Sequence, residues 1–267
     1  MRFVLGEYRQ IGRPRQYKVE QRAVAIARKS LFQGALSEVE WVVAAIAAKP
    51  RGPVASAGGR AKLEESAMRE IASGIYTWSK FSEPHGYDFN GHLVRDAGGN
   101  ICIDPVEPSA EDLAEIKRLG VARIVLTNRN HSRAAKLVRA ATGAPVAIHP
   151  ADAPHAKSQG TIIDEKLAVG QRIGPFTVVA AAGKSPGEVA LHWPERRLLI
   201  IGDAVIGNPP GKCGLLREQV MDEPVTLRRS IAKLLELDFD TMLVGDGVSI
   251  LKGAKERLNE LVASFAS

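Results

Sequence analysis

The stretch that most constrains the fold of this chain is residues 124–135, which read Ile-Val-Leu-Thr-Asn-Arg-Asn-His-Ser-Arg-Ala-Ala. It begins with an apolar, β-branched run that is typical of a buried strand. A polar turn follows from Thr127, and a helix-forming stretch begins at Ser132. A strand that passes through a polar turn directly into a helix predicts an α/β domain, with polar side chains gathered at the strand-to-helix junction.

The same alternation of strand and helix patterns continues over residues 68–267. Apolar runs and alternating patterns predict strands at 71–78, 89–95, 100–103, 121–126, 145–149, 176–182, 187–193, 197–201 and 241–245. Helical patterns with start and stop signals predict helices at 109–119, from the polar turn to Gly143, from near Pro224, and at 251–264. Two successive runs of strands and then helices predict one α/β domain over 68–267.

The positive charge of the chain is concentrated at its start. Residues 1–67 hold twelve Lys or Arg, six Glu and no Asp, which gives a net charge of +6. Residues 68–267 hold 24 of the 36 basic residues and 24 of the 30 acidic ones, so they are neutral. The basic pI therefore belongs to the N-terminal segment, and no nucleic-acid binding is expected of the main domain.

The basic N-terminal segment, residues 1–67, reads as a helix followed by a linker. Residues 18–48 have helical periodicity, and residues 49–62 are rich in Pro, Gly, Ala and Arg. Our interpretation is that this segment lies outside the functional domain, with the native start at Met68 rather than Met1. A membrane-surface or targeting helix is one alternative, and a packing helix that forms a homodimer is another.

Cysteine usage and hydropathy indicate a cytoplasmic protein. Cys102 and Cys213 are far apart and form no Cys-x-x-Cys pair, so free thiols in a reducing compartment are expected. The longest apolar run near the start, residues 41–48, is too short to span a bilayer, and charges interrupt any secretory signal. No transmembrane segment is predicted.

Six short motifs, spread between residues 70 and 264, are informative about the fold because of their order and spacing. They are Asn90 ahead of His92-Leu93-Val94, Ile103-Asp104-Pro105, the Thr127 turn, Ser185-Pro186-Gly187, Gly202-Asp203-Ala204 and Gly245-Asp246-Gly247. In this order they resemble the metallo-β-lactamase-fold superfamily, and within it the glyoxalase II-like hydrolases. The resemblance implies a four-layer αββα sandwich, preceded here by the extra N-terminal helical segment. It also implies hydrolysis at a site that holds one or two zinc or iron ions.

Most of the metal ligands that the resemblance implies are replaced in this chain. With the family motif matched at Thr127, the replacements are Asn128 and Asn130 for the first two histidines, Ser132 for an aspartate, Arg133 for the next histidine, Lys184 for the histidine before Ser185, and Asp246 for the last histidine. The bridging aspartate is kept as Asp203. The chain therefore looks like a divergent member of the superfamily with a degenerate metal-binding motif.

These replacements change the charge of the site. Ammonium and guanidinium groups cannot bind a cation, and a neutral amide is a poor zinc ligand. No metal cofactor is therefore expected, with zinc or iron bound only if the ligand assignment is wrong. We expect Arg133 and Lys184 to pair with Asp203 and Asp246, because unpaired buried carboxylates are costly. An ordinary ion-pair network filling an inactive site is the alternative.

His131 is a spacer in this register, although a shift of two residues would match Asn130-His131 to the family's Asp-His. The candidate catalytic residues are His131 or Asp203 as base and Arg133 or Lys184 as electrophilic group. The candidate substrate-binding residues are Asn128, Asn130, Asp246, His149 and Tyr87. Asp104 is expected to brace the Thr127 turn by hydrogen bonds.

Two functions remain open from the sequence. The first is a divergent hydrolase that acts on an ester, a thioester or a similar bond of a small-molecule substrate. The second is a catalytically inactive, metal-free binding module for an anionic small molecule or a protein partner, in which Arg133 and Lys184 attract the anion. Bound metal, or hydrolysis that Asp203→Ala abolishes, distinguishes the two.

Overall fold

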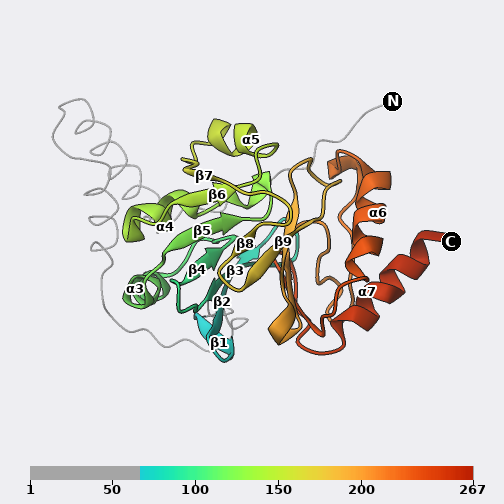
Figure 1. Cartoon of the computed structure of the whole chain (residues 1–267), viewed down its shortest axis with the longest axis horizontal. Helices are drawn as coiled ribbons and strands as arrows, with labels where there is room; N and C mark the ends of the chain where they lie inside the picture. The colour runs from blue at the N-terminus through green and yellow to red at the C-terminus, as the bar shows by residue number, and fades with distance from the viewer. Residues whose placement is uncertain (1–66, 267) are drawn as a thin grey trace, which may run out of the picture. The chain divides into compact units, whose positions relative to one another are not determined.

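The structure is a computed structural model, and it describes residues 67–266. The predictions for the basic N-terminal segment lie outside these residues. The described part of the chain contains two β-sheets that lie between helices (Figure 1). Within it, no helix combines the length and the apolar character needed to cross a membrane.

The first sheet has seven strands in sequence order. They are β1 (Arg69–Ala72), β2 (Ile75–Ser82), β3 (Tyr87–Val94), β4 (Ile101–Ile103), β5 (Arg123–Leu126), β6 (Val146–Ile148) and β7 (Glu165–Lys166). Strands β1 to β4 pair antiparallel, and β4 to β7 pair parallel. The parallel connections are made by α3 (Ala110–Leu119), α4 (Ala135–Thr142) and α5 (Ala153–Ser158).

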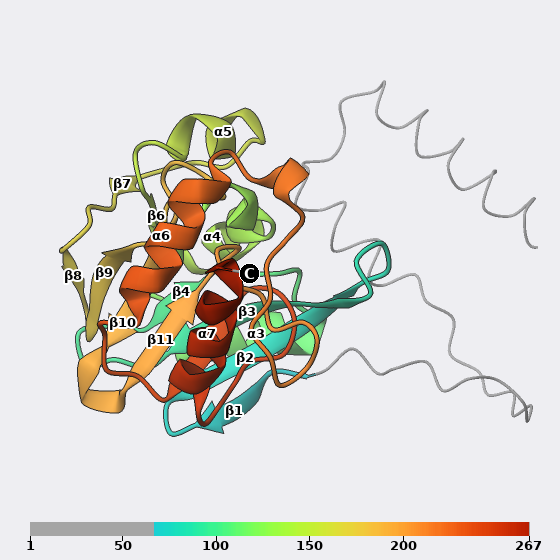
Figure 2. The ribbon, with the colours of Figure 1, turned by 90° about the vertical axis from the view of Figure 1, so that its right-hand side faces the viewer.

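The second sheet has five strands in the order β12-β11-β10-β9-β8. They are β8 (Arg172–Ile173), β9 (Phe176–Ala180), β10 (Val189–Trp193), β11 (Leu198–Ile201) and β12 (Thr241–Val244). Only β11 and β12 pair parallel, because α6 (Pro224–Leu234) connects them. Helix α7 (Ala254–Ala263) follows β12, and Figure 2 shows α6 and α7 side by side over β10 and β11. The short 3₁₀ turns are η1 (Arg129–Ser132), η2 (Pro194–Arg196), η3 (Glu218–Val220) and η4 (Ser264–Ala266).

Alternating side chains along the central strands explain the layers. In β5, Val125 packs between the two sheets, whereas Ile124 points to the outer layer of α3 and α4. In β11, Ile200 packs between the sheets, whereas Leu199 and Ile201 pack against α6 and α7. A strand that is buried on both faces must be apolar at every position, which is why these strands read as continuous apolar runs. The predicted αββα sandwich is confirmed.

Most predicted elements agree with the observed ones to within a few residues, and the predicted helix start at Pro224 is confirmed. The single strand predicted at 71–78 is wrong, because the chain turns at Gly74 and forms two antiparallel strands, β1 and β2. The sequence patterns missed α5, β7 and β8, which have six, two and two residues. Elements this short contain too few residues to establish a periodicity.

His92 joins the two sheets through a buried polar contact. Its Nδ1 lies 2.8 Å from Oγ1 of Thr77 in β2, and its Nε2 lies 3.3 Å from the carbonyl oxygen of Val244 in β12. Burial lowers the pKa of His92 to about 4. The folded protein therefore holds this imidazole neutral, with its Nε2–H donating to Val244.

We expect His92 to make the fold sensitive to acid. In the unfolded chain its pKa is about 6.5, so below that pH the unfolded state takes up a proton that the folded state does not. The free energy of unfolding therefore falls by about 3 kcal/mol between pH 7 and pH 4. Urea unfolding of wild type and His92→Gln at both pH values checks this, because the stability difference between the two proteins should shrink in acid. A pH-independent difference would contradict it.

Candidate active site

The polar residues predicted from the sequence meet at the carboxyl ends of the central strands. Asn128 and His131 follow β5, Asp203 follows β11, and Asp246 follows β12. Lys184 lies in the loop between β9 and β10. Because β5 belongs to one sheet and β11 and β12 to the other, the site forms where the two halves of the sandwich meet.

Two glycines allow the halves to approach closely. A Cβ atom added at Gly245 would lie 2.3 Å from Cε1 of His131, and one added at Gly202 would lie 2.3 Å from Oγ1 of Thr127. Any larger residue would have to displace the side chain of His131 at position 245, or those of Thr127 and Asn128 at position 202. The glycine that precedes Asp203 and the glycine that precedes Asp246 are therefore required for steric reasons.

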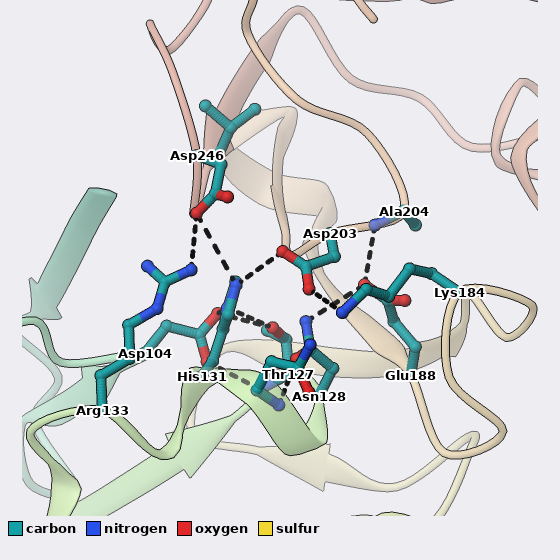
Figure 3. Close-up of polar contacts among 12 residues, drawn as sticks. Asp104, Thr127, Asn128, His131, Arg133, Lys184, Glu188, Asp203, Ala204 and Asp246 are labelled. Carbon is teal, nitrogen blue, oxygen red and sulfur yellow. Dashed lines mark hydrogen bonds and ion pairs between the residues drawn. The ribbon is translucent and has the colours of Figure 1, made fainter. Parts of the chain in front are cut away.

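His131 lies at the centre of the site (Figure 3). It is fully buried, and its Nδ1 donates to Oδ2 of Asp104 over 2.8 Å. Its Nε2 lies 2.9 Å from Oδ1 of Asp203 and 3.9 Å from Oδ1 of Asp246. The interpretation of His131 as a spacer is wrong, because the 3₁₀ geometry of η1 turns this side chain inward.

The charges around His131 are strongly coupled. Burial lowers the pKa of His131, but the carboxylates of Asp104 and Asp203 outweigh burial and raise the pKa to about 10. Burial likewise raises the pKa of Asp203, but His131 and Lys184 hold it well below its usual range. Without a bound ion, the site therefore contains an imidazolium between two carboxylates.

Asp104 braces the turn, as the sequence predicted. Its Oδ1 accepts from the backbone N–H of Thr127 over 2.8 Å, and its Oδ2 accepts from Oγ1 of Thr127 over 2.5 Å. The same Oδ2 accepts from His131, so one carboxylate fixes both the turn and the imidazole. Asp104 has a φ of 47°, a left-handed conformation in which a non-glycine residue is uncommon and often functional.

The predicted ion pairs are also present. Lys184 pairs with Oδ2 of Asp203, and both side chains are almost completely buried. Arg133 donates to Oδ1 of Asp246 over 2.7 Å, and its guanidinium lies 3.8 Å above the centre of the Phe89 ring. Lys184 therefore binds the Asp203 oxygen that His131 does not contact, whereas Arg133 binds the Asp246 oxygen that lies nearest to His131.

A cavity of about 660 Å³ opens from these ion pairs toward solvent. Six of the predicted site residues line it, namely Tyr87, Asn130, Arg133, Lys184, Asp203 and Asp246. Asn128 is buried behind the wall, where its Oδ1 accepts from the backbone N–H of Asn130. The structure does not bring His149 to the cavity, and its Nδ1 accepts from the backbone N–H of Ala151 instead.

The sequence analysis missed Glu188, a buried carboxyl behind the site. Its Oε1 accepts from the backbone N–H of Ala204 over 2.7 Å and from Nδ2 of Asn128 over 3.3 Å. Its Oε2 is buried and has no partner among the described residues, and burial raises the pKa of Glu188. The only sequence signal was an acidic residue at the start of an apolar strand.

Asp152 is a second missed residue, and it joins loops from both halves. It accepts hydrogen bonds from the backbone N–H of Arg129, from Oγ of Ser185 and from the backbone N–H of Gly187. These bonds fix the loop that carries Lys184 against the η1 turn that carries His131. The geometry of the site therefore depends on a residue that does not line its cavity.

The donor atoms at the centre fit one metal ion. His131, Asp203 and Asp246 each offer one ligand atom, and these atoms all lie within 4.8 Å of one another. Ligand atoms around a tetrahedral zinc ion at about 2.1 Å are about 3.4 Å apart, so small movements would close the site. One imidazole and two carboxylates are a suitable set for zinc or iron.

Proteins of known sequence or structure are similar to this chain. Two hydroxyacylglutathione hydrolases of Cereibacter sphaeroides are 31% identical over 160 residues, which is 57% of this chain. The matched region spans 59% of the length of these relatives. The crystal structure of TTHA1623 in a di-iron-bound form is 27% identical, with a TM-score of 0.55, and covers 69% of this chain and 99% of its own. A metallo-beta-lactamase from Pontibacter korlensis superposes with a TM-score of 0.63 at 18% identity, and covers 75% of this chain and 98% of its own.

The expectation that no metal cofactor binds is wrong. A structure similar to this one is known in a di-iron-bound form, and three residues of this chain form a group positioned to bind a metal ion. The error came from the register, which treated His131 as a spacer and left the turn without a histidine ligand. The buried imidazole of His131 is the nitrogen donor of the group that is positioned to bind a metal ion.

The sequence profile of the metallo-beta-lactamase superfamily matches residues 68–265, nearly the whole described part of the chain. The same family is indicated by the fold and by the position of the site at the strand ends. This chain belongs to the metallo-beta-lactamase superfamily.

Proposed function

We propose that this protein hydrolyses an ester or thioester bond of a small molecule at the site around His131. The observation that carries the proposal is the convergence of His131, Asp203 and Asp246, of which both aspartates line a cavity of about 660 Å³ and His131 is buried behind them. Perturbed titratable groups at the end of a cavity are typical of catalytic sites. The relatives named hydroxyacylglutathione hydrolases support an acylated thiol as the substrate.

In this proposal His131, Asp203 and Asp246 hold one zinc or iron ion. When bound, such an ion polarises a carbonyl group and lowers the pKa of a bound water. Asp104 keeps the imidazole of His131 in its orientation through the 2.8 Å bond to Nδ1. Arg133 fixes Asp246 in the same way through the bond to Oδ1.

Lys184 has the position of an electrophilic group. Its ammonium lines the cavity next to Asp203, and its side chain is only 3% exposed. A buried cation whose position is fixed before reaction stabilises negative charge that develops on a carbonyl oxygen. The Asp152 bonds to Ser185 and Gly187 keep the Lys184 loop in place.

The test is hydrolysis by the purified full chain after growth with zinc, iron and manganese supplied. Acyl-glutathione thioesters and p-nitrophenyl esters form the substrate panel, with released thiol or nitrophenol as the readout. We expect turnover that His131→Ala abolishes and His155→Ala, which changes an exposed histidine of α5, leaves intact. Folded, metal-loaded protein without turnover of any substrate would reject the proposal.

A binding module without catalysis is the second candidate function. It is favoured by the ion pairs of Lys184 with Asp203 and of Arg133 with Asp246, which already engage both carboxylates. Saturable binding of an anionic ligand by metal-loaded protein that shows no turnover would support this second function.

A further inference from the structure

We propose that the cavity binds a substrate with an apolar or aromatic body and an anionic group at the end remote from the scissile bond, held by Arg217. This inference rests on the proposed function for the position of the scissile bond. The positions of the apolar body and of the anionic group follow from the residues that line the cavity.

One wall is aromatic and belongs to the hairpin of β2 and β3. The ring centres of His85 and Phe89 are 5.2 Å apart, and those of Tyr87 and Phe89 are 6.1 Å apart. All three rings line the cavity, and Arg133 covers Phe89 at the inner end. Such a cluster of rings binds apolar or planar groups by contact area and ring stacking.

A second part of the cavity lining is aliphatic. It consists of side chains from the chain after Asp203, namely Ile206, Leu215, Leu216 and Val220. Val220 is 48% exposed although its side chain is apolar, and it lies at a surface that a ligand would cover. Two apolar walls around a space of about 660 Å³ fit a ligand with an apolar body.

Charge is distributed unevenly along the cavity. At the inner end, Lys184 and Arg133 are paired with Asp203 and Asp246, so their charges are offset. Arg217 also lines the cavity and is exposed, and its guanidinium forms no hydrogen bond or ion pair with any residue in the part of the chain that the structure describes.

The acidic residues that follow Arg217 are already engaged. Glu218 pairs with Arg228, and Asp222 pairs with Arg129. An anionic group of the ligand would therefore meet cations that are already paired with carboxylates at the inner end, but an unopposed guanidinium at Arg217. This difference orients the ligand, with its anion at Arg217 and its reacting bond near His131.

The proposal is tested with ligands that have no scissile bond, so that it can fail or succeed independently of hydrolysis. Binding of 6-phenylhexanoate, its neutral amide and the corresponding phosphonate to the full chain is measured by isothermal titration calorimetry, with acetate as the probe without an apolar body. We expect the carboxylate to bind about tenfold more tightly than the amide, and acetate to bind far more weakly than 6-phenylhexanoate. A stronger phosphonate would identify a phosphate-like anion as the natural group.

Two variants test whether Arg217 causes the preference for the carboxylate over the amide. Arg217→Gln should remove the advantage of the carboxylate over the amide and leave amide binding unchanged. Lys212→Gln, which removes an exposed cation of the same loop outside the cavity lining, should keep that advantage. Equal affinity of the carboxylate and the amide for wild type, or an undiminished preference in Arg217→Gln, would overturn the proposal.

Discussion

Asp203→Asn is expected to lower hydrolysis by at least about 10²–10³-fold, the effect of removing one fixed electrostatic group from a catalytic site. Asp203 is a proposed ligand of the ion and the shared partner of His131 and Lys184. Its loss leaves two buried cations facing a neutral amide. Steady-state rates with the acyl-thioester panel, and metal content of the same preparations, measure both consequences.

A second variant tests whether Asp203 acts only by neutralising Lys184. In Lys184→Met/Asp203→Asn the buried cation is removed together with its partner, so the fold should recover stability relative to Asp203→Asn. Activity should stay lost, because the proposed ion ligand and the proposed electrophilic group are both missing. Recovery of activity in the double variant would mean that Asp203 only neutralises Lys184, which would contradict its role as a ligand.

Asp104→Asn is expected to destabilise the fold by about 3–5 kcal/mol, the usual effect of removing one partner of a buried ion pair. Asparagine tolerates the left-handed backbone at this position, so the change tests the charge rather than the conformation. The amide can still accept from the backbone N–H of Thr127 through its oxygen, but it cannot neutralise His131. Urea unfolding of the metal-free protein at pH 7, in which His131 is an imidazolium, measures the loss.

Asp238→Asn is the matched control for Asp104→Asn. Asp238 pairs with Arg197 at the surface, where its side chain is 69% exposed, so its loss should change stability by less than about 1 kcal/mol. Losses of similar size in the two variants would contradict the central bracing role of Asp104. Because Asp104 also orients His131, Asp104→Asn should lower activity even where the protein is fully folded.

The fold could be predicted because it depends on patterns that are local in sequence. The apolar runs of β5 and β11 mark strands that are buried on both faces, and the cap at Ser109 marks the start of α3. The motifs around Asp104, Asp203 and Asp246 give the order of the strand ends. Pairings between distant segments then follow from the known architecture of the superfamily.

The site was predicted only in part, because its details depend on turn geometry and on contacts between distant residues. Whether His131 points inward is decided by the 3₁₀ turn η1, which a sequence register cannot show. Glu188 contacts Asn128 across 60 positions of sequence, and Asp152 contacts Ser185 across 33. The ion pairs of Arg133 and Lys184 were predictable, since a buried carboxylate needs a cation.

Metal stoichiometry tests the central claim most directly. Mass spectrometry of the purified full chain, after growth with zinc, iron and manganese supplied, should find about one ion per chain. His131→Gln should lose this ion while it remains folded by circular dichroism, and His155→Gln should retain it. A folded wild-type protein without metal, or an ion that His131→Gln still holds, would contradict the assignment of His131, Asp203 and Asp246 as its ligands.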